Sequence, residues 1–545
     1  MKKYLGVART PTKPSQVRKA LNLVAVDALI IASMSVASQA WAGDWMTIAN
    51  SATAIPGSVG KQFSSFGQPS LNNKCAIAFR GRSSGGGEPA RGVYTGSACK
   101  AGSALQVGAA QGSVVPAPNN LAATFNEFPA FPRLDLQNNL LVTRGQSQPV
   151  WEYTLPDNTD TRVGTSGVYA GLLGNSLRTG ASLLGAVPGF EYFAVPGRPG
   201  VRFDQFPGAP HVFDGNKITF KGNFTDGGVS KTGVYVRNIY LKNGMSEGIR
   251  IADSDTLIPG TSTMFGSTAP PSAANHTVVF AGFDNEETPT LGGIYKATAP
   301  SYKLKAIATI GQPSPDTPSL PFTKYGEAIS YDGNNIGFWA GLGQSTRTVR
   351  LHCPSDGNQA VIDACIEQCP ATDSEGHYCE NQVPVEQGFY VSRPNGRLKM
   401  IARAGAGQPF KDFLFWTFSG RPPGVGGGDS EDTFEPPRWR SSAFASVSQN
   451  GTNVATAFKA VQADDTVGIF VKPTLARAVV PVMVVGSDAT VVDASAPAGS
   501  KVSAIGLERD GLRRCVLAVN ASFLNSDTSA SWAGVYTRAK VCHLK

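Results

Sequence analysis

The sequence has 545 residues, of which 16% are charged, and a formal net charge of +8 at pH 7. Its 61 glycines and 37 prolines, with short runs of Val, Ile, Phe, Tyr and Thr between turn residues, predict an all-β fold and exclude a mainly helical one. Six basic residues and one Asp lie in the first 42 residues, so only +3 remains when their +5 is subtracted, and global charge does not indicate nucleic-acid binding.

Residues 1–42 have the three parts of an export signal. A basic stretch precedes an apolar run from Ala20 to about Val36, and Ala40-Trp41-Ala42 provides the small residues of a cleavage site. An amphipathic N-terminal helix that stays in the mature protein is the alternative. Beyond this segment no apolar run reaches the ~20 residues that span a bilayer. We therefore expect a periplasmic or extracellular protein with no transmembrane anchor after cleavage.

A tripeptide of Gly, a hydrophobic residue and an aromatic residue occurs seven times. The copies are residues 92–94, 167–169, 233–235, 293–295, 388–390, 468–470 and 534–536. When the seven copies are aligned, each belongs to a unit of four short antiparallel strands that is apolar on both faces. Radial stacking of such sheets covers both faces. The predicted fold is a seven-bladed β-propeller, a single domain over residues 43–545.

The last unit has no room for a fourth strand, because the chain stops at Lys545 soon after residues 534–536. The missing strand is predicted at residues 45–49, which have the fourth-strand pattern and precede Ile55-Pro56-Gly57. An N-terminal strand that completes the final blade would leave no open sheet edge. A short, frayed last blade is the alternative.

The eight cysteines are an even number behind an export signal, which favours disulfides. Cys75 and Cys515 occupy equivalent second-strand positions. Cys99 and Cys542 each lie a few residues beyond their Gly-Val-Tyr. The register therefore predicts the pairs Cys75–Cys99 and Cys515–Cys542, on either side of the seam between the first and last blades.

Residues 72–79, Asn-Asn-Lys-Cys-Ala-Ile-Ala-Phe, carry a family resemblance. They resemble the tandem-repeat motif NxxGxxAF of exported bacterial proteins, with Cys75 at the motif glycine and most other copies keeping only the final aromatic. The resemblance implies an extracytoplasmic repeat protein and supplies no catalytic residues.

The first of three insertions in the repeat spans about residues 146–164 and contains Trp151 and Tyr153. Exposed aromatic residues on a loop are typical of glycan-binding sites, whereas a Trp that caps the core is the alternative. Further on, His211 follows Pro210 on a predicted inner strand. It is the best candidate for a general base, and a buried structural histidine is the alternative.

The second insertion, about residues 351–385, holds four cysteines and two histidines. They are Cys353, Cys365, Cys369, Cys379, His352 and His377. The cysteine spacings do not form the paired knuckles of a zinc site, so two disulfides are favoured and no metal is expected. Four cysteines allow three pairings, and the sequence leaves the choice open.

The third insertion, about residues 419–440, contains the glycine-rich run 424–429 and then Arg438-Trp439-Arg440. No strand leads into the glycines and no Lys-Ser/Thr follows them, so a flexible loop is favoured over a phosphate cradle. Two cations beside an indole suit a sugar or an anionic polymer. A loop anchored by Trp439 with solvated arginines is the alternative.

The predicted function is that of a secreted or periplasmic binding or interaction module. Its recognition surface would be the face that carries the three insertions, and its ligand would be a polysaccharide or a protein. We expect a monomer without a cofactor. The alternative is a propeller-type polysaccharide lyase or hydrolase acting on an anionic polysaccharide. His211 or His377 would then act as base, and Arg438 or Arg440 would neutralise a carboxylate.

Overall fold

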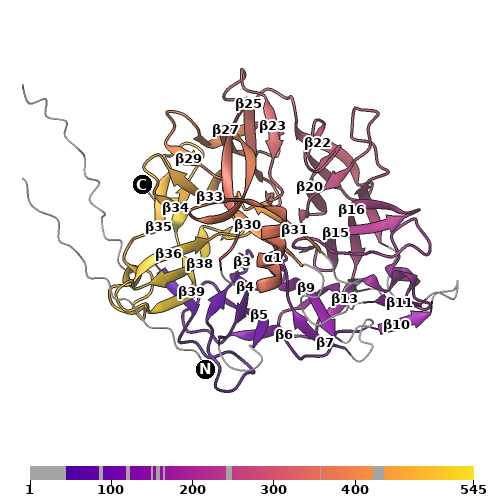
Figure 1. Ribbon diagram of the computed structural model, residues 1–545, viewed down its shortest axis with the longest axis horizontal. Coiled ribbons are helices and arrows are strands. Elements are labelled where there is room, and N and C mark those ends of the chain that lie inside the picture. Colours follow the sequence, from indigo (N-terminus) through magenta and orange to yellow (C-terminus); the bar gives the residue numbers. More distant parts are fainter. Residues whose placement is uncertain are drawn as a thin grey trace, which may run out of the picture. The chain divides into compact units, whose positions relative to one another are not determined.

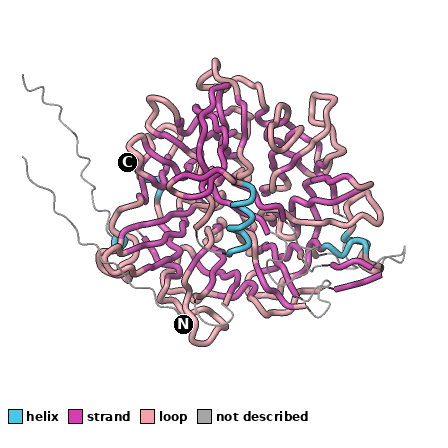
Figure 2. The backbone as a smooth tube through the Cα atoms, in the orientation of Figure 1, coloured by secondary structure: helices cyan, strands magenta, loops and turns pink. Residues whose placement is uncertain are grey.

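The computed structural model describes residues 45–84, 90–117, 123–148, 151–154, 160–163, 166–240, 248–355, 358–421 and 435–544. The chain divides into Met1–Trp41, none of which is described, and Ala42–Lys545. The expected export signal therefore lies outside the described residues. Strands make up most of the described backbone, and the predicted all-β class is confirmed (Figure 2). None of the described helices is both long and apolar enough to cross a bilayer.

Five antiparallel sheets of the described chain contain four or five strands each; four of them follow one another along the chain, and the fifth combines the first described strand with the last ones (Figure 1). They are β1 (Trp45–Asn50), β36 (Lys501–Gly506), β37 (Leu512–Arg513), β38 (Val516–Leu524) and β39 (Ser531–Arg538); β2 (Ser65–Phe66), β3 (Ser70–Leu71), β4 (Ala76–Arg82), β5 (Arg91–Ser97) and β6 (Gln106–Ala110); β7 (Thr124–Glu127), β8 (Arg133–Leu134), β9 (Leu140–Gln148), β12 (Gly167–Leu172) and β13 (Arg178–Ser182); β14 (His211–Phe213), β15 (Lys217–Asp226), β16 (Val229–Asn238) and β17 (Ile249–Asp253); and β18 (Ser267–Thr268), β19 (Ser272–Ala274), β20 (Thr277–Phe283), β21 (Gly292–Thr298) and β22 (Lys303–Thr309).

A further sheet has eleven strands, in two halves that a single parallel bridge between Ala404 and Phe410 joins. The halves are β23 (Phe322–Tyr325), β24 (Ser330–Tyr331), β25 (Ile336–His352), β26 (Ala371–Asp373), β27 (Gly376–Ser392) and β28 (Leu398–Ala404), and β29 (Phe410–Asp412), β32 (Ala445–Asn450), β33 (Asn453–Gln462), β34 (Val467–Lys472) and β35 (Val480–Val484). Outside these sheets lie the two-stranded ribbons β10 (Trp151–Thr154) with β11 (Asp160–Val163) and β30 (Trp416–Arg421) with β31 (Glu435–Ser441), the helix α1 (Gln359–Gln368), and the 3-10 turns η1 (Leu183–Ala186), η2 (Glu191–Phe193), η3 (Ala489–Val491) and η4 (Val541–His543).

Each signature tripeptide lies in the third strand of a four-strand path. These strands are β5, β12, β16, β21, β27, β34 and β39. In most copies the aromatic ring folds back over the glycine two residues before it: a Cβ on Gly92 would lie 2.8 Å from the Tyr94 hydroxyl oxygen, and one on Gly388 would lie 2.6 Å from a Tyr390 ring carbon. An upstream Phe meets the same ring edge-on, as Phe63 does at 4.9 Å from Tyr94. The repeat is therefore an aromatic cluster with no room for a side chain at its glycine.

This packing predicts the effect of one methyl group. Gly388→Ala should lower the free energy of unfolding by about 1–3 kcal/mol, because the added Cβ would overlap the Tyr390 ring in a packed core. Gly326→Ala is the matched control, since its Cβ would find its nearest neighbour at 3.6 Å. Urea denaturation of both variants measures the difference, and equal stabilities would contradict the explanation.

The first described strand, β1, belongs to the same sheet as the last, β39. The two pair antiparallel, with Met46 opposite Thr537. Beyond the pairing, the Asn50 side-chain amide donates to a carboxylate oxygen of buried Asp493 at 2.9 Å, and the same oxygen accepts from the Tyr536 hydroxyl at 2.9 Å. One carboxylate therefore joins the start of the described chain to the last signature strand.

Four disulfides are formed, and no described cysteine is free. Two of them, Cys75–Cys99 and Cys515–Cys542, are the pairs that the register predicts. The other two are Cys353–Cys365 and Cys369–Cys379, the pairing that the sequence left open.

Candidate functional site

The three insertions leave their sheets at the same end of the signature strand, the end that carries the glycine. Strands β9 and β12 pair as far as Gly145 and Gly167, and the ribbon β10–β11 lies in the connection just beyond them. Strands β25 and β27 continue past the pair Ala340–Gly388. The third insertion follows β29, which pairs with β33 next to the equivalent glycine, Gly468. In Figure 1 the ribbon β10–β11 lies apart from α1.

The second and third insertions pack against each other. Helix α1 begins where the Asn358 side chain accepts from the backbone N–H of Ala360 at 3.0 Å, and it lies against the ribbon β30–β31. The Gln368 side-chain amide donates to the Pro437 carbonyl at 3.1 Å. The paired residues 346–352 and 378–384 form a two-stranded extension that we call the arm. We call α1, the ribbon β30–β31 and the arm together the platform.

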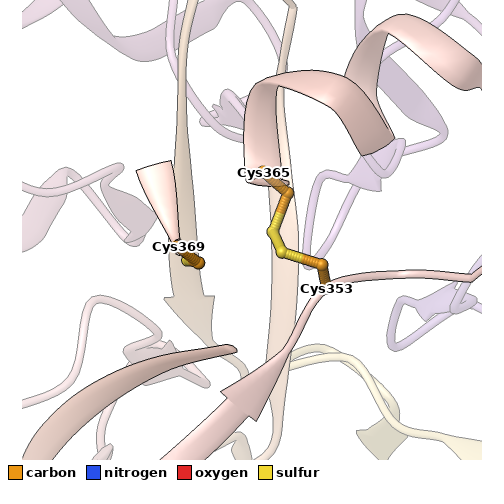
Figure 3. A group of neighbouring side chains, drawn as sticks. All are labelled: Cys353, Cys365 and Cys369. Carbon is orange, nitrogen blue, oxygen red and sulfur yellow. A yellow bond between two sulfur atoms is a disulfide. The ribbon is translucent and has the colours of Figure 1, made fainter. Parts of the chain in front are cut away.

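The interior of the platform is built from sulfur and aromatic rings. Cys353–Cys365 joins the end of β25 to α1, and Cys369–Cys379 joins the end of α1 to β27 (Figure 3 shows the first bridge with Cys369 beside it). Phe418 and Trp439 pack on these sulfurs with ring centres 5.3 Å apart. The two disulfides thus brace the second insertion internally, and a small hydrophobic core holds the ribbon of the third insertion against it.

The Arg438-Trp439-Arg440 segment lies on this body. The Trp439 ring contacts Phe418 on the paired strand β30, and both rings pack against the cysteines of the second insertion. Arg438 forms an ion pair with Glu286, in the connection between β20 and β21. Burial, and then the neighbouring Arg440, lowers the pKa of Arg438 to about 10. The ribbon β30–β31 therefore reaches the end of the β20–β21 sheet where the signature glycine lies. It brings the guanidinium groups of Arg438 and Arg440 close together there.

One face of the arm carries a group of residues that the sequence did not single out as a set. Asp373 accepts from His352 Nε2 at 2.9 Å and from Arg350 Nη1 at 3.2 Å. The Arg350 guanidinium lies 4.6 Å from the centre of the Tyr378 ring. The alternation Arg350-Leu351-His352 in a strand was the available signal, because alternate residues share a face. This alternation does not show which strand pairs with residues 350–352.

His211 lies in a buried polar cluster on the inner strands of the sheets. Its Nε2 is 3.3 Å from Asp510 Oδ2, and the same oxygen accepts from Arg133 Nε at 2.6 Å. All three side chains are at most 2% exposed. His377 contacts the Cys369 carbonyl and Arg438 pairs with Glu286, so neither shares a described partner with His211. A substrate would have to displace the cluster to reach this imidazole.

Asp510 belongs to a short loop, residues 508–511, that contacts many inner strands. The Arg509 carbonyl accepts from the Ser330 hydroxyl at 2.6 Å and from the Ser446 hydroxyl at 3.0 Å. The Arg509 guanidinium donates to the Pro270 carbonyl at 3.3 Å, and the backbone N–H of Leu71 donates to the Asp510 carbonyl at 3.0 Å. We call residues 508–511 the central segment, because the innermost residues of the other sheets meet on it.

The buried histidine makes stability depend on pH. Burial, and secondarily the Arg133 guanidinium, lowers the pKa of His211 to about 4. Since an unfolded chain binds that proton near pH 6.5, this contribution to stability is complete above pH 6.5 and is lost as the pH falls toward 4. We expect the wild type to lose up to about 3 kcal/mol more than His211→Gln between pH 7 and pH 4. Chemical denaturation at several pH values measures this, and parallel curves would contradict it.

Other predicted site residues are only partly placed. Trp151 and Tyr153 lie in β10, and their side chains are outside the described residues, as is the glycine run 424–429. His377 Nδ1 lies 3.2 Å from the Cys369 carbonyl oxygen.

No family model matches the chain, and no curated protein matches it. Solved structures similar to it include the polysaccharide lyase Uly1 (7% identity, 92% of this chain and 99% of that chain, TM-score 0.39). A prolyl endopeptidase (9%, 87% and 50%, TM-score 0.35) and an exo-inulinase from Aspergillus awamori (11%, 87% and 96%, TM-score 0.26) are also similar. The chain spans half the length of the prolyl endopeptidase chain. Similarities at these TM-scores assign no function.

Proposed function

We propose that this chain is an exported seven-bladed β-propeller, closed by β1, whose platform binds an anionic polysaccharide. The seven-bladed arrangement is supported by the seven third strands with one shared packing, and closure by the pairing of β1 with β39. Four disulfides support an oxidising compartment, periplasmic or extracellular. The protein acts as a monomeric binding module.

The observation that carries the binding proposal is the union of two separate insertions into one body. The two disulfides fix α1 to the strands β25 and β27, and the packing of Phe418 and Trp439 on the cysteines holds the ribbon against α1. Rigid presentation of side chains lowers the entropic cost of binding. Such a device suits recognition better than it suits stability.

The side chains of the platform favour an anionic sugar polymer. Arg438 and Arg440 lie side by side, and Arg350 stacks on Tyr378. Guanidinium groups bind carboxylates through charge-assisted hydrogen bonds, and rings pack on the apolar faces of sugars. A polyuronate offers both features in every repeat unit.

Binding to a polyuronate tests the proposal directly. We expect Arg438→Ala/Arg440→Ala to raise the Kd at least about tenfold, because hydrogen bonds to charged groups contribute about 1.5–3 kcal/mol. Arg393→Ala/Arg397→Ala is the charge-matched control, since both arginines lie at the turn between β27 and β28. Isothermal titration with a polyuronate and a neutral glucan measures both. An equal loss of affinity in the two variants would contradict the proposal. Absence of binding to the polyuronate would also contradict it, and a protein would then be the remaining candidate ligand.

A second candidate is a polysaccharide lyase or hydrolase, which the face of the arm favours. His352 is oriented by Asp373 beside Tyr378 and Arg350, so a base, a phenol and a cation lie together. Release of an unsaturated uronate, followed by ultraviolet absorbance, tests the lyase. Activity that His352→Ala abolishes would favour the enzyme over the binding module, whereas activity that survives would exclude this group as its centre.

A further inference from the structure

The two disulfides of the platform lie unusually close together. The sulfur atoms of Cys353, Cys365 and Cys369 are all within 4.8 Å of one another. Figure 3 shows Cys369 beside the bridge between Cys353 and Cys365. A sulfur atom of one bridge is therefore within a short displacement of both sulfur atoms of the other. Within the described part of the chain no other cysteines form such a group.

The four cysteines differ in exposure in an ordered way. Cys365 and Cys369, the inner pair, are fully buried, and both come from α1 or its end. Cys353 and Cys379, the outer pair, are half-buried; Cys353 directly follows one strand of the arm, and Cys379 lies in the other. Each native bridge joins one outer to one inner cysteine. An external thiol can thus reach an outer sulfur, and the thiolate that it releases is an inner one.

We propose that these cysteines form a thiol–disulfide relay in which one dithiol molecule opens both links between the arm and α1. A thiolate of the dithiol attacks Cys379 Sγ and breaks the Cys369–Cys379 bond. The Cys369 thiolate attacks Cys365 Sγ, forms Cys365–Cys369, and displaces Cys353, which takes up a proton. The second thiol of the dithiol then closes its own disulfide and releases Cys379 as a thiol. The protein gains two thiols, and the dithiol is oxidised by two electrons.

The direction of the relay follows from solvation and from geometry. A buried thiolate among apolar groups is high in free energy and strongly basic. Because nucleophilicity rises with basicity, the Cys369 thiolate attacks Cys365 Sγ. The product places its thiols on the half-buried cysteines, where water can reach them. Attack at Cys353 leads to the same product through Cys365. Cys369 caps α1, and its backbone N–H donates to the Cys365 carbonyl at 2.8 Å, so the two cysteines are already held close together.

The new bridge has a different mechanical role from the native ones. Cys365–Cys369 would lie within α1 and its cap, so it would join nothing to the arm. A single two-electron reduction would therefore free both strands of the arm from the helix, whereas two independent bridges would need two. The proposal does not depend on what the platform binds.

Limited reduction of the full native chain tests the relay. One equivalent of dithiothreitol is added, thiols are trapped with N-ethylmaleimide, and peptides are mapped by mass spectrometry. The relay predicts label on Cys353 and Cys379 of the same molecule together with a Cys365–Cys369 bridge. Label on both members of one native pair, with the other pair intact, would overturn it. A platform that stays unlabelled while Cys515–Cys542 opens would also overturn it, because the outer sulfurs would then be unreachable.

A double variant provides the control. In Cys369→Ser/Cys379→Ser the relay has no attacking sulfur, so label must appear on Cys353 and Cys365 together. The isolated pair Cys515–Cys542 serves as an internal reference, since reduction there should label only its own two cysteines. Equal patterns in the wild type and the double variant at Cys353 and Cys365 would contradict the relay.

Discussion

Replacing Asp510 with Ala should lower the free energy of unfolding by about 3–5 kcal/mol, because it removes one partner of a fully buried ion pair. Arg133 would lose the carboxylate that pairs with it, and His211 would lose its acceptor. Arg513, which also pairs with Asp510, would lose a partner as well. Guanidinium chloride denaturation measures the loss.

Two further variants show whether the loss comes from the pair. Arg133→Met/Asp510→Leu removes both charges and should cost less than the sum of the single variants, since Arg133 no longer remains as an unpaired charge, although Arg513 still loses its partner. Glu287→Ala changes an exposed carboxylate and should stay within about 0.5 kcal/mol of the wild type. A cost for Asp510→Ala no larger than that of Glu287→Ala would show that the central segment does not hold the sheets together.

Deleting residues 45–50 should convert the protein into an associating species of low stability. Strand β39 would lose its outer partner, and its unpaired N–H and C=O groups would pair with another chain. We expect larger species in size-exclusion chromatography with light scattering, and a broadened thermal transition. An unchanged monomer with a sharp transition would contradict the proposed closure by β1.

A milder variant separates strand pairing from the side-chain contact. Asn50→Ala keeps β1 and removes only the hydrogen bond to Asp493, so it should cost about 1 kcal/mol without association. If Asn50→Ala associates as the deletion does, the contact with Asp493 rather than the strand pairing is what prevents association.

The strands and two of the disulfides could be predicted because their signals are local. The signature glycine and its aromatic residue lie two positions apart, and the ring covers the glycine within one strand. Cys75 and Cys99 are 24 residues apart and occupy neighbouring strands of one unit. Periodicity within a unit is enough to place such residues, because neighbouring strands of a unit are joined by short turns.

The candidate site was predicted only in outline. The sequence located insertions at about 351–385 and 419–440, but the packing of Phe418 and Trp439 on the disulfides depends on how two separate units stack. The Arg350–Tyr378 contact joins two paired strands, β25 and β27, and the register of their pairing shifts before this contact. A sequence motif does not reveal such a shift.

The sequence by itself determined the repeat, the all-β class and the cysteine pairs nearest the chain ends, because each rests on spacing within a unit. Only the tertiary structure decided the partner of His211 and the centre of the fold. Arg133 and Asp510 are 377 residues apart, and the charge of one stabilises the other only when the sheets are stacked. Such a pair leaves no periodic trace in the chain, since its energy depends on distance in space and on burial.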